Sequence, residues 1–95
     1  MLSVESAYRL YSLKNELDKN RREQEQTTLE INNMQLEFEN IVSNMHNMDK
    51  EECSIKLNKM LNVLKEKIAE VEKRDEFIER AKQEIISLQL ELKEE

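Results

Sequence analysis

The sequence predicts an all-α protein in which two long helices pair as an antiparallel coiled-coil hairpin. The 95 residues include no Gly and no Pro, the residues that tight turns between strands usually require. Charged residues make up 38% of the chain, which is typical of long amphipathic helices. Apolar residues recur with the 3.5-residue spacing of a heptad repeat in both halves. We therefore expect a single coiled-coil module over residues 1–95.

The first helix is expected over residues 5–46. Steps of three and four residues from Leu10 reach twelve positions, of which nine are apolar. Those nine positions are Leu10, Leu13, Leu17, Ile31, Met34, Phe38, Ile41, Met45 and Met48. The three polar positions, Asn20, Gln24 and Thr27, predict polar layers within the seam between the helices.

The repeat changes phase between Met48 and Leu57, which predicts a turn over residues 47–50. The two registers are offset by two residues, whereas a continuous coiled coil absorbs insertions of three or four residues most easily. Asp49 is followed three residues later by Glu52, which resembles a capping box at the start of a helix. We therefore expect Asp49 to cap the second helix.

The second helix is expected over residues 50–93, in the new register. Its d positions are all apolar, and its a positions include two charged residues. The d positions are Leu57, Leu64, Val71, Ile78, Ile85 and Leu92, and the a positions are Leu61, Ile68, Asp75, Lys82 and Gln89. Asp75 and Lys82 are therefore expected in the core.

These two charged residues favour the hairpin over the alternative, which is one long continuous helix in a parallel coiled-coil dimer. In that dimer Asp75 and Lys82 would each face their own copy, and burying like charges is costly. In a hairpin that turns at residue 51, Lys82 instead meets Asn20 and Asp75 meets Thr27. Glutamates along the first helix then face two cations of the second, namely Glu16, Glu23, Glu30 and Glu37 against Lys67 and Arg74.

The composition excludes several classes of function. Without Gly there is no phosphate-binding loop, and no set of nucleophile, His and acid is visible, so we expect no enzyme and no cofactor. One His and one Cys, His46 and Cys53, make a poor zinc site. The net charge of -6 argues against binding nucleic acid. No window approaches the roughly 18 apolar residues of a membrane span.

The sequence also predicts a reducing compartment. Cys53 is the only cysteine and cannot form an internal disulfide. Glu5 and Arg9 stand where a signal peptide would have its apolar segment. We therefore expect an intracellular protein, cytoplasmic or nuclear, whose cysteine lies near the exposed tip of the hairpin.

Apolar residues outside the predicted seam indicate that the chain binds another protein. At the open end of the hairpin these residues are Val4, Tyr8, Tyr11, Ile86, Leu88 and Leu90. We expect them to gather at one end and to dock a partner helix or a second hairpin. The alternative is a locally widened core, because the repeat also shifts through Ile78, Ala81, Ile85 and Leu88. On the first reading the protein is a non-enzymatic assembly module.

Two other functions remain open. The chain could be a rod segment of a longer cytoskeletal, chromosomal or tethering protein. Alternatively, the acidic turn with Asp49, Glu51 and Glu52 is similar in architecture to the coiled-coil tips of transcript-cleavage factors. That resemblance implies a regulator that inserts an acidic tip into a partner enzyme, although the globular domain of those factors has no counterpart here.

Overall fold

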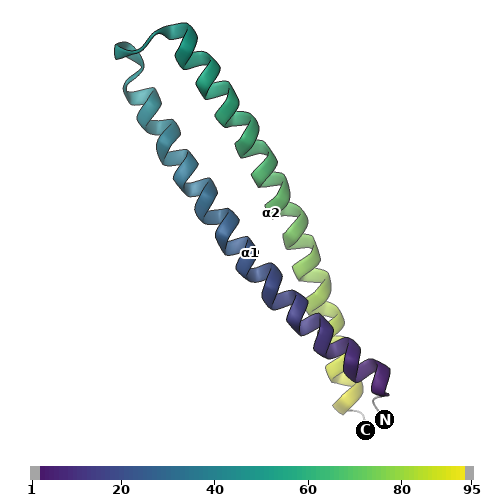
Figure 1. Cartoon of the computed structure of the whole chain (residues 1–95). Coiled ribbons are helices and arrows are strands. Elements are labelled where there is room, and N and C mark those ends of the chain that lie inside the picture. Colours follow the sequence, from purple (N-terminus) through teal and green to yellow (C-terminus); the bar gives the residue numbers. More distant parts are fainter. Residues whose placement is uncertain (1–2, 94–95) are drawn as a thin grey trace. The chain divides into compact units, whose positions relative to one another are not determined.

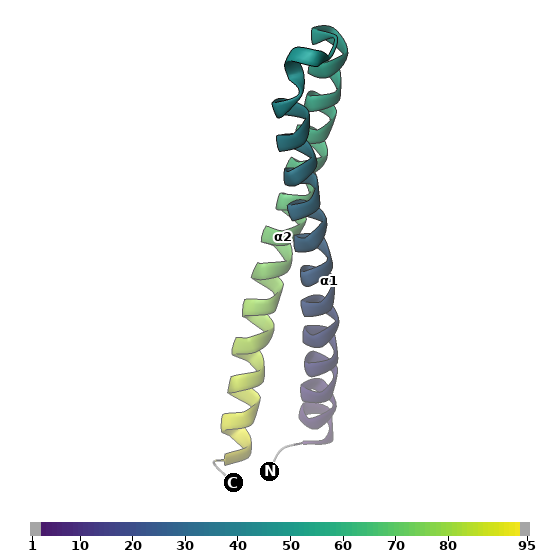
Figure 2. The ribbon, with the colours of Figure 1, turned by 90° about the vertical axis from the view of Figure 1, so that its left-hand side faces the viewer.

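The computed structural model describes residues 3–93, which form two long α-helices joined by a short turn (Figure 1). Helix α1 spans Val4–Ser43, the 3-10 turn η1 spans Met45–Asn47, and helix α2 spans Lys50–Lys93. The described residues contain no strand. The start of α1 and the end of α2 lie at the same end in both views (Figures 1 and 2). The predicted antiparallel two-helix hairpin is confirmed.

Contacts divide the hairpin into two compact units, each built from one stretch of α1 and one stretch of α2. The terminal unit comprises Met1–Gln24 and Lys73–Glu95. The turn unit comprises Glu25–Glu72 and includes the connection between the helices. Each unit has its own pattern of burial and charge.

Both helices begin at a side-chain cap. The Ser3 hydroxyl accepts a hydrogen bond from the backbone N–H of Ser6 at 3.1 Å. The Asp49 carboxylate accepts one from the backbone N–H of Glu51 at 3.2 Å, as the sequence predicts for this residue. Such caps satisfy amide groups that have no partner within the helix. They also explain why α2 begins directly after Asp49.

Helix α1 ends at Ser43, three residues before its predicted end, so the connection occupies residues 44–49 rather than 47–50. The backbone changes at Asn44, whose N–H is shared by the Asn40 carbonyl at 3.2 Å and the Ile41 carbonyl at 3.1 Å. The Asn44 side-chain amide also donates to the Asn40 carbonyl, at 2.9 Å. A bond to the carbonyl three residues back tightens the last turn into the 3-10 geometry that follows. The heptad positions Met45 and Met48 therefore lie in the connection and not on α1.

The terminal unit contains a compact apolar cluster. Leu13 and Leu17 of α1 pack with Ile78, Ala81 and Ile85 of α2, and all five side chains are buried. Half-buried side chains that pack against this cluster are Leu10, Phe77 and Leu88. Burying a Leu or Ile side chain contributes about 1.5–3 kcal/mol. The cluster is therefore the main apolar anchor of this unit. The Leu92 side chain, a predicted core position, lies outside the described residues.

The seam that α2 turns toward α1 differs from the predicted one. The predicted d positions whose side chains are described are buried or half-buried, but the a positions Leu61 and Ile68 are 41% and 44% exposed. The residues that alternate with the d positions on the observed seam are Cys53, Met60, Lys67, Arg74, Ala81 and Leu88. Long cations fit a seam because their alkyl stems cover apolar surface while their charged ends reach its edge.

The predicted polar layers are wrong at Asp75. Asp75 is exposed and accepts a hydrogen bond from the Gln24 side chain at 2.6 Å instead of facing Thr27. Thr27 is buried as expected. The Asn20 side chain is half-buried and donates to the Glu16 carbonyl at 2.7 Å. Lys82 is half-buried at the side of the seam. Asp75 and Lys82 lie off the seam because Arg74 and Ala81 occupy it.

Candidate interaction surfaces

Ion pairs join the two helices along one side of the seam in each unit. In the terminal unit, the Arg74 Nε lies 3.7 Å from a Glu23 carboxylate oxygen. In the turn unit, the Lys67 Nζ lies 2.5 Å from a Glu30 oxygen. Both pairs join a glutamate of the expected row to a cation of the second helix, so that part of the prediction is confirmed. The hydrogen bond to Glu30 raises the pKa of Lys67.

A further pair lies near the open end of the terminal unit. The guanidinium of Arg9 donates two hydrogen bonds to the two carboxylate oxygens of Glu84, at 3.0 and 3.1 Å. This two-point contact is the geometry that an arginine and a carboxylate prefer. The hydrogen bonds and the positive charge of Arg9 lower the pKa of Glu84. The pair joins α1 to α2 beside the predicted docking residues.

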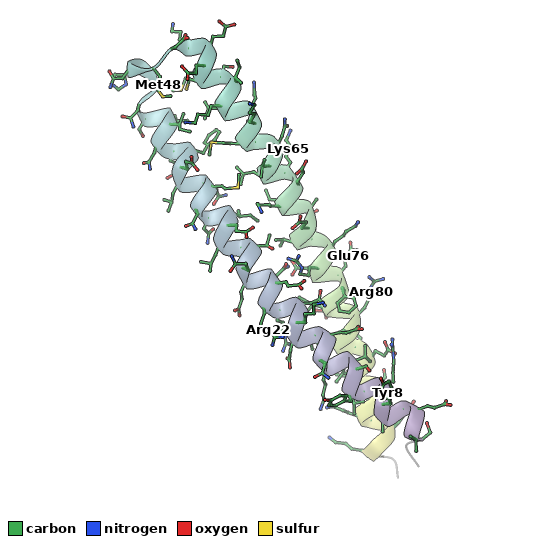
Figure 3. All side chains as sticks on the ribbon, viewed as in Figure 1. Tyr8, Arg22, Met48, Lys65, Glu76 and Arg80 are labelled. Atoms are coloured by element: carbon green, nitrogen blue, oxygen red, sulfur yellow. The ribbon has the colours of Figure 1, made fainter. Side chains whose placement is uncertain are left out.

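An apolar stripe runs along the outer face of α1. Tyr8 and Tyr11 are 72% and 67% exposed, and Val4 is more exposed still. These residues are spaced four and three apart, which places them on one face of a helix. Val4, Tyr8 and Ser12 line a shallow groove together with Glu5 and Arg9. Figure 3 shows Tyr8 near the start of α1. We call Val4, Tyr8 and Tyr11 the tyrosine stripe.

A second stripe lies on α2. Ile86 and Leu90 are 48% and 54% exposed, and they line a shallow groove with Gln89 and Lys93. We call Ile86 and Leu90 the aliphatic stripe. Each groove is lined by residues of one helix only. Five of the six residues predicted to form one patch therefore form two separate stripes.

Leu88 belongs to neither stripe. It is half-buried and packs against the core cluster of the terminal unit. The expectation that it forms part of the docking surface is wrong, because the observed seam of α2 runs through this position. For this residue, the widened core is the correct description.

The acidic tip has a structural explanation. Asp49, Glu51 and Glu52 are all exposed at the start of α2, and the Asp49 carboxylate serves as the helix cap. Within residues 3–93, no three His, Cys, Asp or Glu side chains form a group that could hold a metal ion.

Cys53 lies in the first turn of α2, near the tip as expected, but it is buried and not exposed. Its side chain is 0% exposed and its thiol is free. Figure 3 shows Met48 within the turn.

The turn unit has a groove that the sequence did not predict. Gln35, Phe38 and Glu39 of α1 line it together with Leu61 and Leu64 of α2. The prediction missed it because Leu61 was assigned to the seam. The missed signal is that α2 carries two overlapping apolar repeats, only one of which α1 can cover.

The chain matches no protein-family model, and comparisons with curated proteins and with solved structures gave no significant match. Within residues 3–93, neither helix has a stretch long and apolar enough to cross a membrane.

Proposed function

We propose that this protein is a non-enzymatic assembly module that binds another helical protein, or its own copy, through the terminal unit. The observation that carries the proposal is the exposure of Tyr8 and Tyr11 beside Val4 on one face of α1. Large apolar stripes with a polar rim are typical of protein-binding surfaces. Glu5, Arg9 and Ser12 supply such a rim.

The size of these side chains supports a binding role. A tyrosine buries about 150–250 Å² when it is covered, and it brings few rotatable bonds to be ordered. Tyrosine is accordingly enriched among the residues that dominate interface energies. An amphipathic helix would cover such a stripe with residues spaced three and four apart.

The charge distribution also favours the terminal unit as the docking region. This unit carries ten basic and eleven acidic residues, whereas the turn unit carries five basic and ten acidic residues. A nearly balanced surface repels neither acidic nor basic partners strongly. Approach of an acidic protein, such as a second copy of this chain with its net charge of -6, is least opposed there.

Site-specific photo-crosslinking tests this function. A photoreactive phenylalanine analogue placed at Tyr8 in the full chain, in the cells that make it, should give covalent adducts with a protein. The matched control is the same analogue at Leu36, an exposed apolar residue of the turn unit. Equal adduct yields at both positions, or adducts at neither, would contradict the proposal.

A further inference from the structure

We propose that the partner is a second copy of this chain, and that the contact joins two different surfaces, one from each copy. The tyrosine stripe on α1 of one copy binds the aliphatic stripe on α2 of the next. This inference rests on the proposed function and adds the partner and the mode of contact. All the residues involved belong to the terminal unit.

The two stripes face away from each other. Leu13 and Leu17 point into the core cluster, and at 3.6 residues per turn Tyr8 lies about half a turn around α1 from them. On α2, Leu90 lies similarly far around the helix from Ile85. The single-helix lining of each groove agrees with this placement. One terminal unit therefore presents the stripes on opposite sides and cannot cover one with the other.

The stripes also lie at the same level along the helices. Tyr8 precedes the core residue Leu13 by five positions, and Leu90 follows the core residue Ile85 by five positions. Because α1 and α2 are antiparallel, five positions before Leu13 and five positions after Ile85 both lead toward the open end of the hairpin. A copy displaced sideways, without rotation, consequently places its tyrosine stripe against the aliphatic stripe of its neighbour.

One charge beside each groove is complementary in this arrangement, and the other charge beside the α1 groove, Arg9, is already paired with Glu84. Glu5 lines the groove on α1, and Lys93 lines the groove on α2. Glu5 lies eight positions before Leu13, and Lys93 lies eight positions after Ile85. The same sideways displacement therefore brings the carboxylate of one copy to the level of the ammonium group of the next. This match favours a second copy as the occupant.

A contact between unlike surfaces does not close on itself. After two copies have joined, one tyrosine stripe and one aliphatic stripe remain free, so further copies add by the same contact. Assembly should therefore grow with concentration instead of stopping at a dimer.

Two complementary variants test the inference. Tyr8→Glu removes one stripe and Leu90→Glu removes the other, while both residues are exposed and glutamate suits a helix. Sedimentation of the wild-type chain should show mass rising beyond a dimer with concentration. Each variant alone should remain monomeric to at least tenfold higher concentration. An equimolar mixture should form a 1:1 dimer and stop there, because only one productive contact is possible.

Several results would overturn the inference. If either variant alone associates as the wild type does, the contact joins like surfaces. If the mixture remains monomeric while the wild type associates, another surface is used. A wild-type chain that stays monomeric also removes the second copy as partner, and adducts at position 8 would still support the proposed function in that case. Leu36→Glu is the matched control and should associate as the wild type does.

Discussion

The two units of the hairpin are built from the same two helices, but they bury apolar residues differently. The terminal unit gathers five buried side chains into one cluster. In the turn unit, Leu61 and Ile68 remain substantially exposed beside the seam, and Lys67 lies on it. Two helices have one shared seam, so apolar residues outside its path stay in solvent. Which residues lie on the seam therefore matters more than how many apolar residues a segment has.

The largest expected difference between the units concerns core truncation. Leu17→Ala removes a side chain from the terminal cluster and should lower the free energy of unfolding by about 2–5 kcal/mol, the usual range for a buried leucine. Leu64→Ala in the turn unit should cost less, because Leu64 lines an open groove that water fills after truncation. Urea denaturation followed by circular dichroism measures both.

Ile68→Ala serves as the control for that comparison. Ile68 is off the seam, so its truncation should change stability much less than either leucine substitution. A larger loss for Ile68→Ala than for Leu17→Ala would mean that the predicted seam, rather than the observed one, holds the helices together.

A smaller effect is expected at the cap of α2. Asp49→Ala leaves the amide of Glu51 without its side-chain acceptor and should cost about 1 kcal/mol. Hydrogen exchange should quicken in the first turn of α2 and remain unchanged in the terminal unit. Glu51→Ala removes a neighbouring exposed acid but keeps the backbone amide that Asp49 caps, and it is the control. Equal effects of the two substitutions would show that net charge, not capping, explains the loss.

The smallest effect concerns the ion pair between Arg9 and Glu84. Arg9 lowers the pKa of Glu84, so the pair stabilises the fold above the ordinary carboxyl pKa of 4.5. This contribution is lost as the pH falls through the lowered pKa of the folded state. The stability difference between wild type and Glu84→Gln should be constant well above pH 4.5 and shrink at more acidic pH. A difference that grows on acidification would contradict the pairing.

Most of the fold could be predicted from the sequence, because helix period and caps depend on neighbouring residues. The spacing that begins at Leu10, the polar cap at Asp49 and the phase change beyond Met48 are all local signals. They predicted an antiparallel hairpin, and the structure has one. The exact end of α1 was missed because the backbone tightens to 3-10 bonding at Asn44, and the heptad pattern does not record such a change.

The seam of α2 was misassigned because two repeats share its d positions. The predicted repeat adds two apolar residues, Leu61 and Ile68, whereas the other repeat adds four, namely Cys53, Met60, Ala81 and Leu88. The structure uses the other repeat, whose additional residues include Lys67 and Arg74. The cost of burying like charges therefore indicated the correct fold, although the charged residues on the seam are Lys67 and Arg74 and not Asp75 and Lys82.

The spacing of charged residues on the two helices could have identified the observed seam. Glu23 and Glu30 are seven residues apart, as are Lys67 and Arg74, so both ion pairs form in one antiparallel register. The same register explains why the residues predicted as one patch at the open end do not lie together. With the observed seam, Leu88 turns inward and the tyrosine and aliphatic stripes fall on opposite sides. Site prediction failed where it depended on that choice.

The enclosed thiol of Cys53 offers a way to time the breathing of the turn unit. A thiol-reactive reagent cannot reach a sulfur atom with no solvent contact, so modification must wait for the surrounding helices to part. At high reagent concentration the labelling rate becomes the opening rate of that region. The native chain thus carries its own kinetic probe at the end farthest in sequence from either terminus, and no reporter has to be introduced.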